Sequence, residues 1–168
     1  MEALHAIQHK IQTRTEAVAT VAHWKQEGSR VVFTNGCFDI LHYGHIQYLA
    51  EARDLGQRLV VGLNASESVS RLKGPHRPIN DEKTRAHLLA ALQTVDLVVI
   101  FEEDTPFDLI AALLPDVLVK GGDWKPKQIV GSDVVLARGG AVRSLQFADG
   151  YSTTNIEQRI LDLHGLKR

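Results

Sequence analysis

Residues 31–45 read Val-Val-Phe-Thr-Asn-Gly-Cys-Phe-Asp-Ile-Leu-His-Tyr-Gly-His. The stretch begins with an unbroken β-branched and aromatic run, which is typical of a strand buried on both faces of a parallel sheet. Asn35 and Gly36 tolerate positive φ values, so we predict that the strand ends there in a tight turn. From Tyr43 onward apolar residues recur at helical spacing. The stretch therefore predicts a strand, a turn and a helix that starts between residues 42 and 44.

Two histidines stand at the start of this predicted helix. His42 and His45 are three residues apart, so they are expected to share one face of its first turn. Gly44 between them leaves room for a ligand to approach the backbone. A helix N-terminus offers unpaired N–H groups and the positive end of the macrodipole, and both favour an anion. Imidazoles at that place can donate hydrogen bonds to phosphate oxygens and stabilise the charge that develops during phosphoryl or nucleotidyl transfer.

We interpret this turn as a phosphate-handling site and the two histidines as catalytic residues. The alternative is a pair of ordinary surface histidines, and the other six histidines of the chain are read in that way. The functional interpretation is preferred because the strand, the Asn-Gly turn, Asp39 and the His-x-Gly-His pattern occur together in the required order.

Composition limits the class of protein. The chain has 168 residues, 44% of them hydrophobic, which is enough for one well-buried core. Nineteen basic and twenty acidic residues leave a net charge of −1, so neither nucleic acid nor a membrane surface is expected as a partner. Cys37 is the one cysteine, which excludes an intramolecular disulfide. With no signal-peptide or membrane-span pattern, the cytoplasm is the default expectation.

The remaining patterns alternate between strand and helix. Strand, helix, strand within about thirty residues is a βαβ unit, whose right-handed crossover places it in a parallel sheet. We predict a single Rossmann-like, doubly wound α/β domain with a five-stranded parallel sheet flanked by helices. Residues 1–28 are predicted to be a helical extension packed on a domain at 29–168, with the first ten residues frayed. Strands are expected at 31–33, ended by the Asn35-Gly36 turn, and at 58–63, 95–101, 117–120 and 141–147.

The fourth predicted strand ends in Lys120, which is followed by Gly121, Gly122 and Asp123. In an open parallel sheet, ligands bind beyond the carboxyl ends of the strands. Lys120 is therefore expected to point into the same crevice as the two histidines. The paired glycines would allow close approach of a nucleotide, and Asp123 could accept a hydrogen bond from a ribose or sugar hydroxyl. The alternative is that Gly-Gly-Asp is only a turn.

A second group of hydroxyls begins the last predicted helix. Ser152 is expected to be its N-cap. A cap accounts for one hydroxyl but not for Thr153 and Thr154 as well, so we predict a second anion site here by the same argument as for the first.

A basic, turn-rich loop reads Lys73-Gly-Pro-His-Arg77-Pro. It is either a solvated surface turn or a mobile loop that closes over a triphosphate. In the second case Lys73 or Arg77 would stabilise the leaving pyrophosphate.

On these residues the sequence resembles the His-x-Gly-His nucleotidyltransferase superfamily. Thr-Asn-Gly-Cys-Phe-Asp-Ile-Leu-His-Tyr-Gly-His is most similar to the D-glycero-β-D-manno-heptose 1-phosphate adenylyltransferases, and the likeness runs from about Lys10 to Leu161. The resemblance implies transfer of an adenylyl group from ATP to that sugar phosphate, which gives ADP-heptose and pyrophosphate for the lipopolysaccharide inner core. It implies Mg²⁺ on the triphosphate, with Asp39 considered as a ligand, and a homodimer, with the N-terminal helix as a candidate contact.

The resemblance also implies that Arg85 faces the substrate, although a solvent-exposed arginine is an open alternative, and that residues 152–154 contact the phosphates. The predicted catalytic residues are His42, His45 and Lys120. The residues predicted to bind ATP and the sugar phosphate are Asn35, Gly36, Phe38, Asp39, Gly44, Lys73, Arg77, Arg85, Gly121, Gly122, Asp123, Ser152, Thr153 and Thr154.

Two other functions stay open. A cytidylyltransferase acting on glycerol 3-phosphate or a similar alcohol phosphate would resemble relatives with Arg-Thr-x-Gly before Ile-Ser-Thr-Thr, but Phe147 and Ala148 stand at the matching positions. A nucleotide-binding module without catalysis would usually lack a histidine or the lysine, and this chain keeps all three. Neither Gly-x-Gly-x-x-Gly nor a P-loop pattern is present, so a dinucleotide-binding dehydrogenase or P-loop enzyme is not supported.

Overall fold

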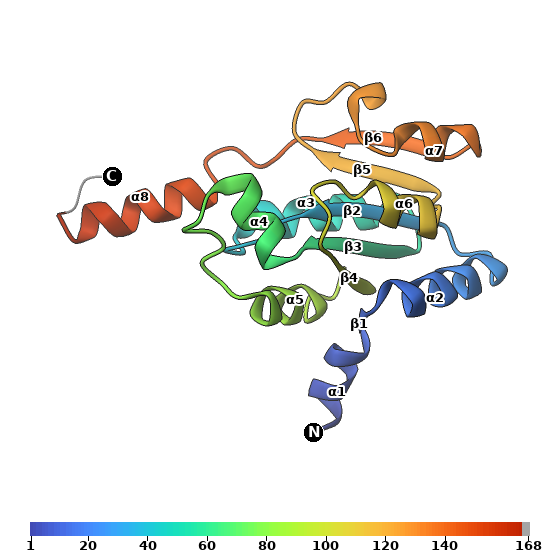
Figure 1. Cartoon of the computed structure of the whole chain (residues 1–168), viewed down its shortest axis with the longest axis horizontal. Coiled ribbons are helices and arrows are strands. Elements are labelled where there is room, and N and C mark those ends of the chain that lie inside the picture. The colour runs from blue at the N-terminus through green and yellow to red at the C-terminus, as the bar shows by residue number, and fades with distance from the viewer. Residues whose placement is uncertain (166–168) are drawn as a thin grey trace.

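The computed structural model describes residues 1–165. Six strands form one parallel sheet in the order β1-β4-β3-β2-β5-β6, with helices on both faces (Figure 1). The strands are β1 (Ile11–Gln12), β2 (Val31–Gly36), β3 (Arg58–Asn64), β4 (Leu97–Phe101), β5 (Val117–Gly121) and β6 (Ala141–Leu145). The helices are α1 (Glu2–His9), α2 (Arg14–Gln26), α3 (Tyr43–Arg53), α4 (Ser66–Lys73), α5 (Glu82–Ala90), α6 (Phe107–Leu113), α7 (Ser132–Ala137) and α8 (Thr153–Leu163), with a 3-10 turn, η1, at Pro126–Gln128.

The parallel α/β architecture predicted from the sequence is confirmed, with one more strand than expected. The additional strand, β1, has two residues and pairs with β4 at the edge of the sheet. Two residues are too few to produce a strand pattern in the sequence. The residues before β1 form α1 instead of being frayed. Lys10 fastens this region, since its Nζ donates to the backbone oxygens of Leu92 at 3.2 Å and Val95 at 2.8 Å.

The two faces of the sheet are covered by separate apolar clusters. Val31 and Phe33 of β2 belong to a cluster with α2 and α6, whereas Val32 belongs to a cluster with α3 and α5. Successive side chains of a strand point to opposite faces, so a strand covered on both sides is apolar throughout. This explains why residues 31–33 show no alternation, and it fixes β2 in the middle of the domain.

The strand order reverses direction beside β2. The chain passes from β2 to β3 and β4 on one side, and then returns to β5 and β6 on the other. In an open parallel sheet, the crevice at such a reversal is where ligands bind. The carboxyl ends of β2 and β5, at Gly36 and Gly121, therefore flank the place where a site is expected.

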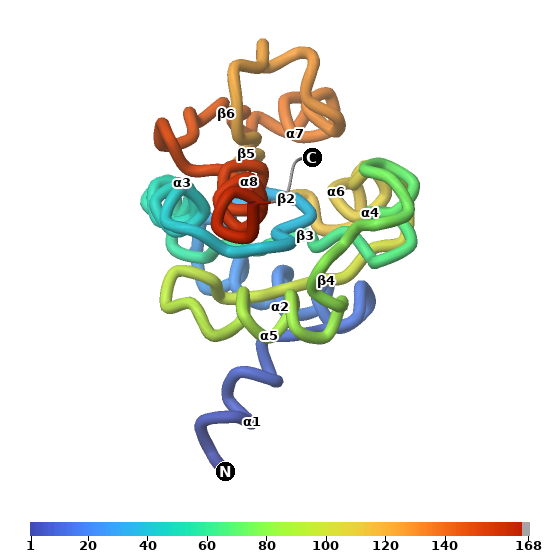
Figure 2. The backbone as a smooth tube through the Cα atoms, turned by 90° about the vertical axis from the view of Figure 1, so that its left-hand side faces the viewer, coloured from blue at the N-terminus to red at the C-terminus, as the bar shows by residue number. Residues whose placement is uncertain are grey.

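Side-chain caps define several helix starts, and the one predicted at Ser152 is among them. Thr13 and Glu16 form a capping box at α2, Asp81 accepts from the backbone N–H of Thr84 at α5, and Ser152 caps α8. None of the residues of α8 is buried. Figure 1 shows α8 projecting from the carboxyl end of the sheet, and Figure 2 shows α1 projecting at the N-terminal end of the chain.

Candidate active site

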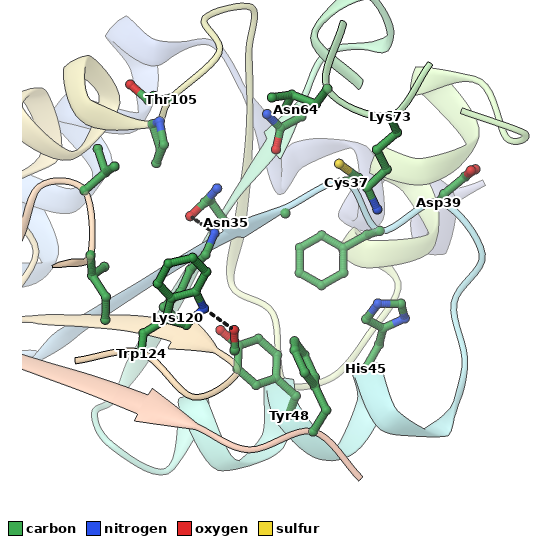
Figure 3. Close-up of a pocket in the computed structure, with 18 of the residues that line it drawn as sticks. Asn35, Cys37, Asp39, His45, Tyr48, Asn64, Lys73, Thr105, Lys120 and Trp124 are labelled. Atoms are coloured by element: carbon green, nitrogen blue, oxygen red, sulfur yellow. Dashed lines mark hydrogen bonds between the residues drawn. The ribbon is translucent and has the colours of Figure 1, made fainter. Parts of the chain in front are cut away.

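A pocket of about 470 Å³ opens at the carboxyl ends of β2, β3 and β5. Figure 3 shows the side chains of labelled residues from these strands and from α3 directed into it. Of the residues predicted from the sequence, it is lined by Asn35, Gly36, Phe38, Asp39, His45, Lys73, Lys120, Gly121 and Thr153. The predicted residues outside the lining are His42, Gly44, Arg77, Arg85, Gly122, Asp123, Ser152 and Thr154.

The turn after β2 is compact and strained. Phe38 has a φ of +44°, in the left-handed region that non-glycine residues seldom adopt. Its ring lies against Gly36, where an added Cβ would be only 3.0 Å from a ring carbon. The same ring lies 5.3 Å from the imidazole of His45, centroid to centroid. The turn thus places an aromatic wall between the end of β2 and the first turn of α3.

The two histidines of the motif are in direct contact. Their rings are stacked, with centroids 3.9 Å apart and an interplanar angle of 26°. Burial, the neighbouring His42 and Lys73 together lower the pKa of His45 to about 4, and burial lowers the pKa of His42. Both rings are therefore neutral near pH 7, and each keeps one N–H to donate. Within residues 1–165, the buried Nδ1 atoms of both rings have no hydrogen-bond partner.

Lys120 reaches the pocket from β5. Its Nζ lies 3.4 Å from Oδ1 of Asn35, which stands on the neighbouring strand β2. Burial lowers the pKa of Lys120, because an ammonium group loses part of its hydration there. A partly desolvated ammonium beside a single amide oxygen is well suited to charge-assisted hydrogen bonds with a phosphate.

Asp39 is occupied by protein donors. Its carboxylate is 3% exposed and accepts from Nη1 of Arg77 and from the backbone N–H groups of Ile79 and Asn80, each at 2.8 Å. Burial alone would raise the pKa of Asp39, but these hydrogen bonds and the charge of Arg77 outweigh it and lower the pKa. Arg77 also forms an ion pair with Glu157 of α8. The structure therefore ties the 73–80 loop to Asp39 and to α8.

This arrangement bears on the predicted metal. The carboxylate oxygens that would have to bind Mg²⁺ are already hydrogen-bonded in the Asp39 cluster. Among the described residues, no three His, Cys, Asp or Glu side chains are grouped so that they could hold a metal ion. The residues present thus do not fit a metal site built by the protein.

Arg85 lies inside the protein and is neither solvent-exposed nor part of the pocket lining. Its guanidinium donates to the backbone oxygens of Asn80 at 3.1 Å, Cys37 at 2.9 Å and Asn64 at 2.8 Å, and to Oγ of Ser66 at 3.2 Å. One side chain thus joins the turn after β2, the end of β3 and the start of α5. Sequence periodicity gave no signal for this role, because all four acceptors are distant in the sequence or on the backbone.

The predicted hydroxyl cluster divides into three roles. Thr153 lines the pocket, the hydroxyl of Ser152 accepts from the backbone N–H of Asn155 at 3.0 Å, and Thr154 is exposed. The start of α8 lies beside the start of α3, since the rings of Tyr43 and Tyr151 are 5.1 Å apart. The two helix N-termini predicted to bind anions are therefore brought together.

Several lining residues were missed at the sequence level. They are Tyr48, Asn64, Thr105 and Phe147, none of which was predicted to bind a ligand. Tyr48 shares a 2.5 Å hydrogen bond with Thr34, and burial raises its pKa to about 12. Trp124 donates from Nε1 to the backbone oxygen of Gly121 at 3.1 Å.

Comparison with known proteins agrees with this geometry. Residues 33–159 match the family described as "Cytidylyltransferase-like". The chain belongs to this family. The match contains the His-x-Gly-His pair, Lys120 and the start of α8, so the family assignment covers every element that lines the pocket. The membership confirms the resemblance inferred from residues 34–45.

Individual relatives extend the comparison. The chain is 56% identical over 151 residues to "Bifunctional protein HldE" of Magnetococcus marinus, which covers 90% of this chain and 31% of that protein. It is 57% identical over 141 residues to the protein of the same name from Geobacter metallireducens, covering 84% and 29%. The chain thus spans about a third of the length of these curated relatives.

A solved structure shows the same fold. It is the crystal structure of the lipopolysaccharide core biosynthesis protein from Thermoplasma volcanium, with a TM-score of 0.60 and 31% sequence identity. The alignment covers 74% of this chain and all of that one. In this chain, no helix within residues 1–165 is long and apolar enough to cross a membrane.

Proposed function

We propose that this chain transfers the adenylyl group of ATP to D-glycero-β-D-manno-heptose 1-phosphate, yielding ADP-D-glycero-β-D-manno-heptose and pyrophosphate for the lipopolysaccharide inner core. The observation that carries the proposal is the meeting of His45, Lys120, Lys73 and Thr153 in one pocket at the switch point of the sheet. Family membership supports nucleotidyl transfer, and the similarity to the HldE proteins and to a lipopolysaccharide core biosynthesis protein supports the choice of sugar.

The proposed reaction is one in-line displacement. An oxygen of the sugar phosphate attacks the α-phosphorus of ATP, the bond from that phosphorus to the bridging oxygen breaks, and pyrophosphate leaves with the bonding electrons. No covalent intermediate on the protein is required. Catalysis then consists of positioning and charge stabilisation, as in phosphoryl transfer generally.

The histidines and the lysine have distinct proposed roles. His45 lines the pocket and would donate from its neutral ring to the α-phosphate or bridging oxygen. His42 stacks on His45 and orients it, with its own N–H available at the start of α3. Lys120, at the carboxyl end of the neighbouring strand β5, would hold the triphosphate or the incoming phosphate. Thr153 would add a hydroxyl donor from α8.

Mg²⁺ is proposed to enter as the complex with ATP. The site offers no cluster of carboxylates to hold a resident ion within the described residues. The residues of this chain would then bind the nucleotide's oxygens and leave the ion to the phosphates and water, as is common for Mg²⁺.

The proposal extends to location and assembly. We propose a cytoplasmic enzyme, because ATP is a cytoplasmic substrate, and a homodimer, because α1 and α8 bury none of their residues in the domain. Light scattering coupled to size-exclusion chromatography would measure the mass in solution. A monomer at micromolar concentration would contradict the dimer without affecting the reaction.

The test of the reaction is pyrophosphate release by the purified protein with Mg²⁺. ATP and CTP are each combined with heptose 1-phosphate and with glycerol 3-phosphate. Release with ATP and heptose 1-phosphate alone is expected. Release with CTP and glycerol 3-phosphate would instead identify a cytidylyltransferase, and binding of nucleotide without release in any combination would identify a non-catalytic module.

A further inference from the structure

Asn64 is a buried polar residue inside the pocket that sequence motifs did not single out. It is the last residue of β3, it is 3% exposed, and it lines the pocket. Most buried polar side-chain atoms have at least one hydrogen-bond partner, either in the protein or in ordered water. In Asn64 the amide nitrogen is hydrogen-bonded within the protein, and the carbonyl oxygen faces the cavity.

The orientation of the amide is fixed by its neighbours. Nδ2 of Asn64 donates to Oγ of Ser68 at 3.0 Å, and that hydroxyl in turn donates to the backbone oxygen of Glu103 at 3.1 Å. Because Ser68 has a single hydroxyl proton and it is engaged with Glu103, its oxygen must accept from Asn64. The NH₂ group of Asn64 therefore faces Ser68, and its carbonyl oxygen faces away.

That carbonyl oxygen points into the pocket. Figure 3 shows it directed toward the interior, between Asn35 and Lys73. Within the described part of the chain, no donor is hydrogen-bonded to it, whereas the backbone oxygen of the same residue is held by Arg85 at 2.8 Å. Asn64 is thus pinned through its side chain and its backbone, with one acceptor left for a ligand.

The pocket has two chemically different ends. Trp124 and Phe147 line it, are 46% and 48% exposed, and carry rings that suit stacking against a nucleobase. Asn64 and Thr105 also line it and offer polar groups. Figure 3 shows Asn64 and Thr105 on one side of Asn35 and Trp124 on the other.

We propose that Asn64 is a specificity-determining residue that accepts a hydrogen bond from a hydroxyl of the sugar phosphate. The inference rests on the proposed sugar-phosphate nucleotidyltransferase and assigns one end of its pocket. Ser68 accepts from one N–H of the amide and fixes its orientation, so the group that Asn64 presents to the pocket is its carbonyl oxygen, an acceptor that matches a hydroxyl donor.

The test is the kinetics of Asn64→Ala with heptose 1-phosphate and ATP. We expect the KM for the sugar phosphate to rise about 10- to 100-fold, since a hydrogen bond to a polar substrate group is lost and the site was built around it. The KM for ATP should stay within about twofold of that of the unaltered protein. Gln93→Ala, which removes an exposed amide far from the pocket, is the matched control and should change neither constant.

A second variant and altered substrates distinguish a lost hydrogen bond from a folding defect in Asn64→Ala. Ser68→Ala leaves Asn64 in place but frees its amide to rotate, so it should raise the same KM by a smaller factor. Singly deoxygenated heptose 1-phosphates are then assayed with the unaltered protein and with Asn64→Ala. With the unaltered protein, one of these deoxygenated sugars should have a higher KM than heptose 1-phosphate. With Asn64→Ala, that same sugar and heptose 1-phosphate should have similar KM values.

The outcomes separate the two proposals. Absence of turnover by the unaltered protein would overturn the proposed reaction and this role with it. Normal turnover by the unaltered protein, combined with an unchanged KM for the sugar phosphate in Asn64→Ala, would overturn only the role of Asn64. A rise confined to the KM for ATP would move Asn64 to the nucleotide and would equally contradict the assignment.

Discussion

The ring of Phe147 occupies the space that a side chain at Gly121 would need. A Cβ built on Gly121 would overlap three atoms of that ring. The ring also lies 5.3 Å from that of Tyr48, and both residues line the pocket. Glycine at the end of β5 thus allows the segment between β6 and α8 to lie over the pocket.

Gly121→Ala should displace Phe147 and lower kcat/KM by about tenfold or more, because small misplacements at an active site are costly. The midpoint of thermal unfolding should change little, since the half-exposed ring can swing into solvent. In Gly121→Ala combined with Phe147→Ala the clash is gone, so the two losses should be less than additive. Strictly additive losses would show that the ring and the glycine act separately.

His45→Ala should abolish measurable turnover while the fold is retained. Removal of a single well-placed donor to a developing charge costs roughly a hundredfold or more in rate. The measurement is pyrophosphate release, with thermal unfolding as the check on the fold. His23→Ala removes an exposed histidine and serves as the matched control. Normal turnover by His45→Ala would contradict the proposed site.

The stability of the protein should fall as the pH drops from about 6.5 toward 4. Burial lowers the pKa of His45 to about 4, against 6.5 in the unfolded chain. In that interval the unfolded chain binds a proton that the folded protein does not bind. The stabilisation is therefore complete above pH 6.5 and is lost as the pH approaches 4.

The pH effect is measured by urea unfolding at several pH values between 4.5 and 7.5. His45→Asn should show a shallower dependence of unfolding free energy on pH than the unaltered protein. Equal slopes in the two proteins would mean that the pKa of His45 is not depressed.

Asp39→Asn should lower the free energy of unfolding by about 3 kcal/mol, as expected when one partner of a buried ion pair is neutralised. The substitution leaves Arg77 without its carboxylate and sets an amide NH₂ against the backbone donors of Ile79 and Asn80. Chemical unfolding measures the loss. Asp149→Asn changes an exposed carboxylate and should be nearly neutral. An equally small loss of unfolding free energy in both variants would show that the hydrogen bonds of Asp39 do not stabilise the 73–80 loop.

Local sequence patterns were sufficient to predict the parallel α/β architecture. Residues 31–33 predicted a strand buried on both faces, and Ser152 was predicted as the N-cap that it is in the structure. The His-x-Gly-His pair was singled out because it follows a strand, and Lys120 because it lies at the end of one. These signals are local, since burial, capping and turn chemistry act over a few residues.

Which polar residues face the pocket depends on contacts between distant parts of the chain, which local patterns do not encode. Asp39 and Arg77 pair with each other, and Arg85 joins backbone segments, so these three predicted binding residues are held by partners within the protein. Asn64 is the opposite case, because it belongs to no sequence motif and yet lines the pocket from the end of β3. Their roles depend on partners up to 80 positions away. A charge or an amide looks the same in sequence whether its partner is the protein, water or a substrate, and only the folded chain supplies that partner.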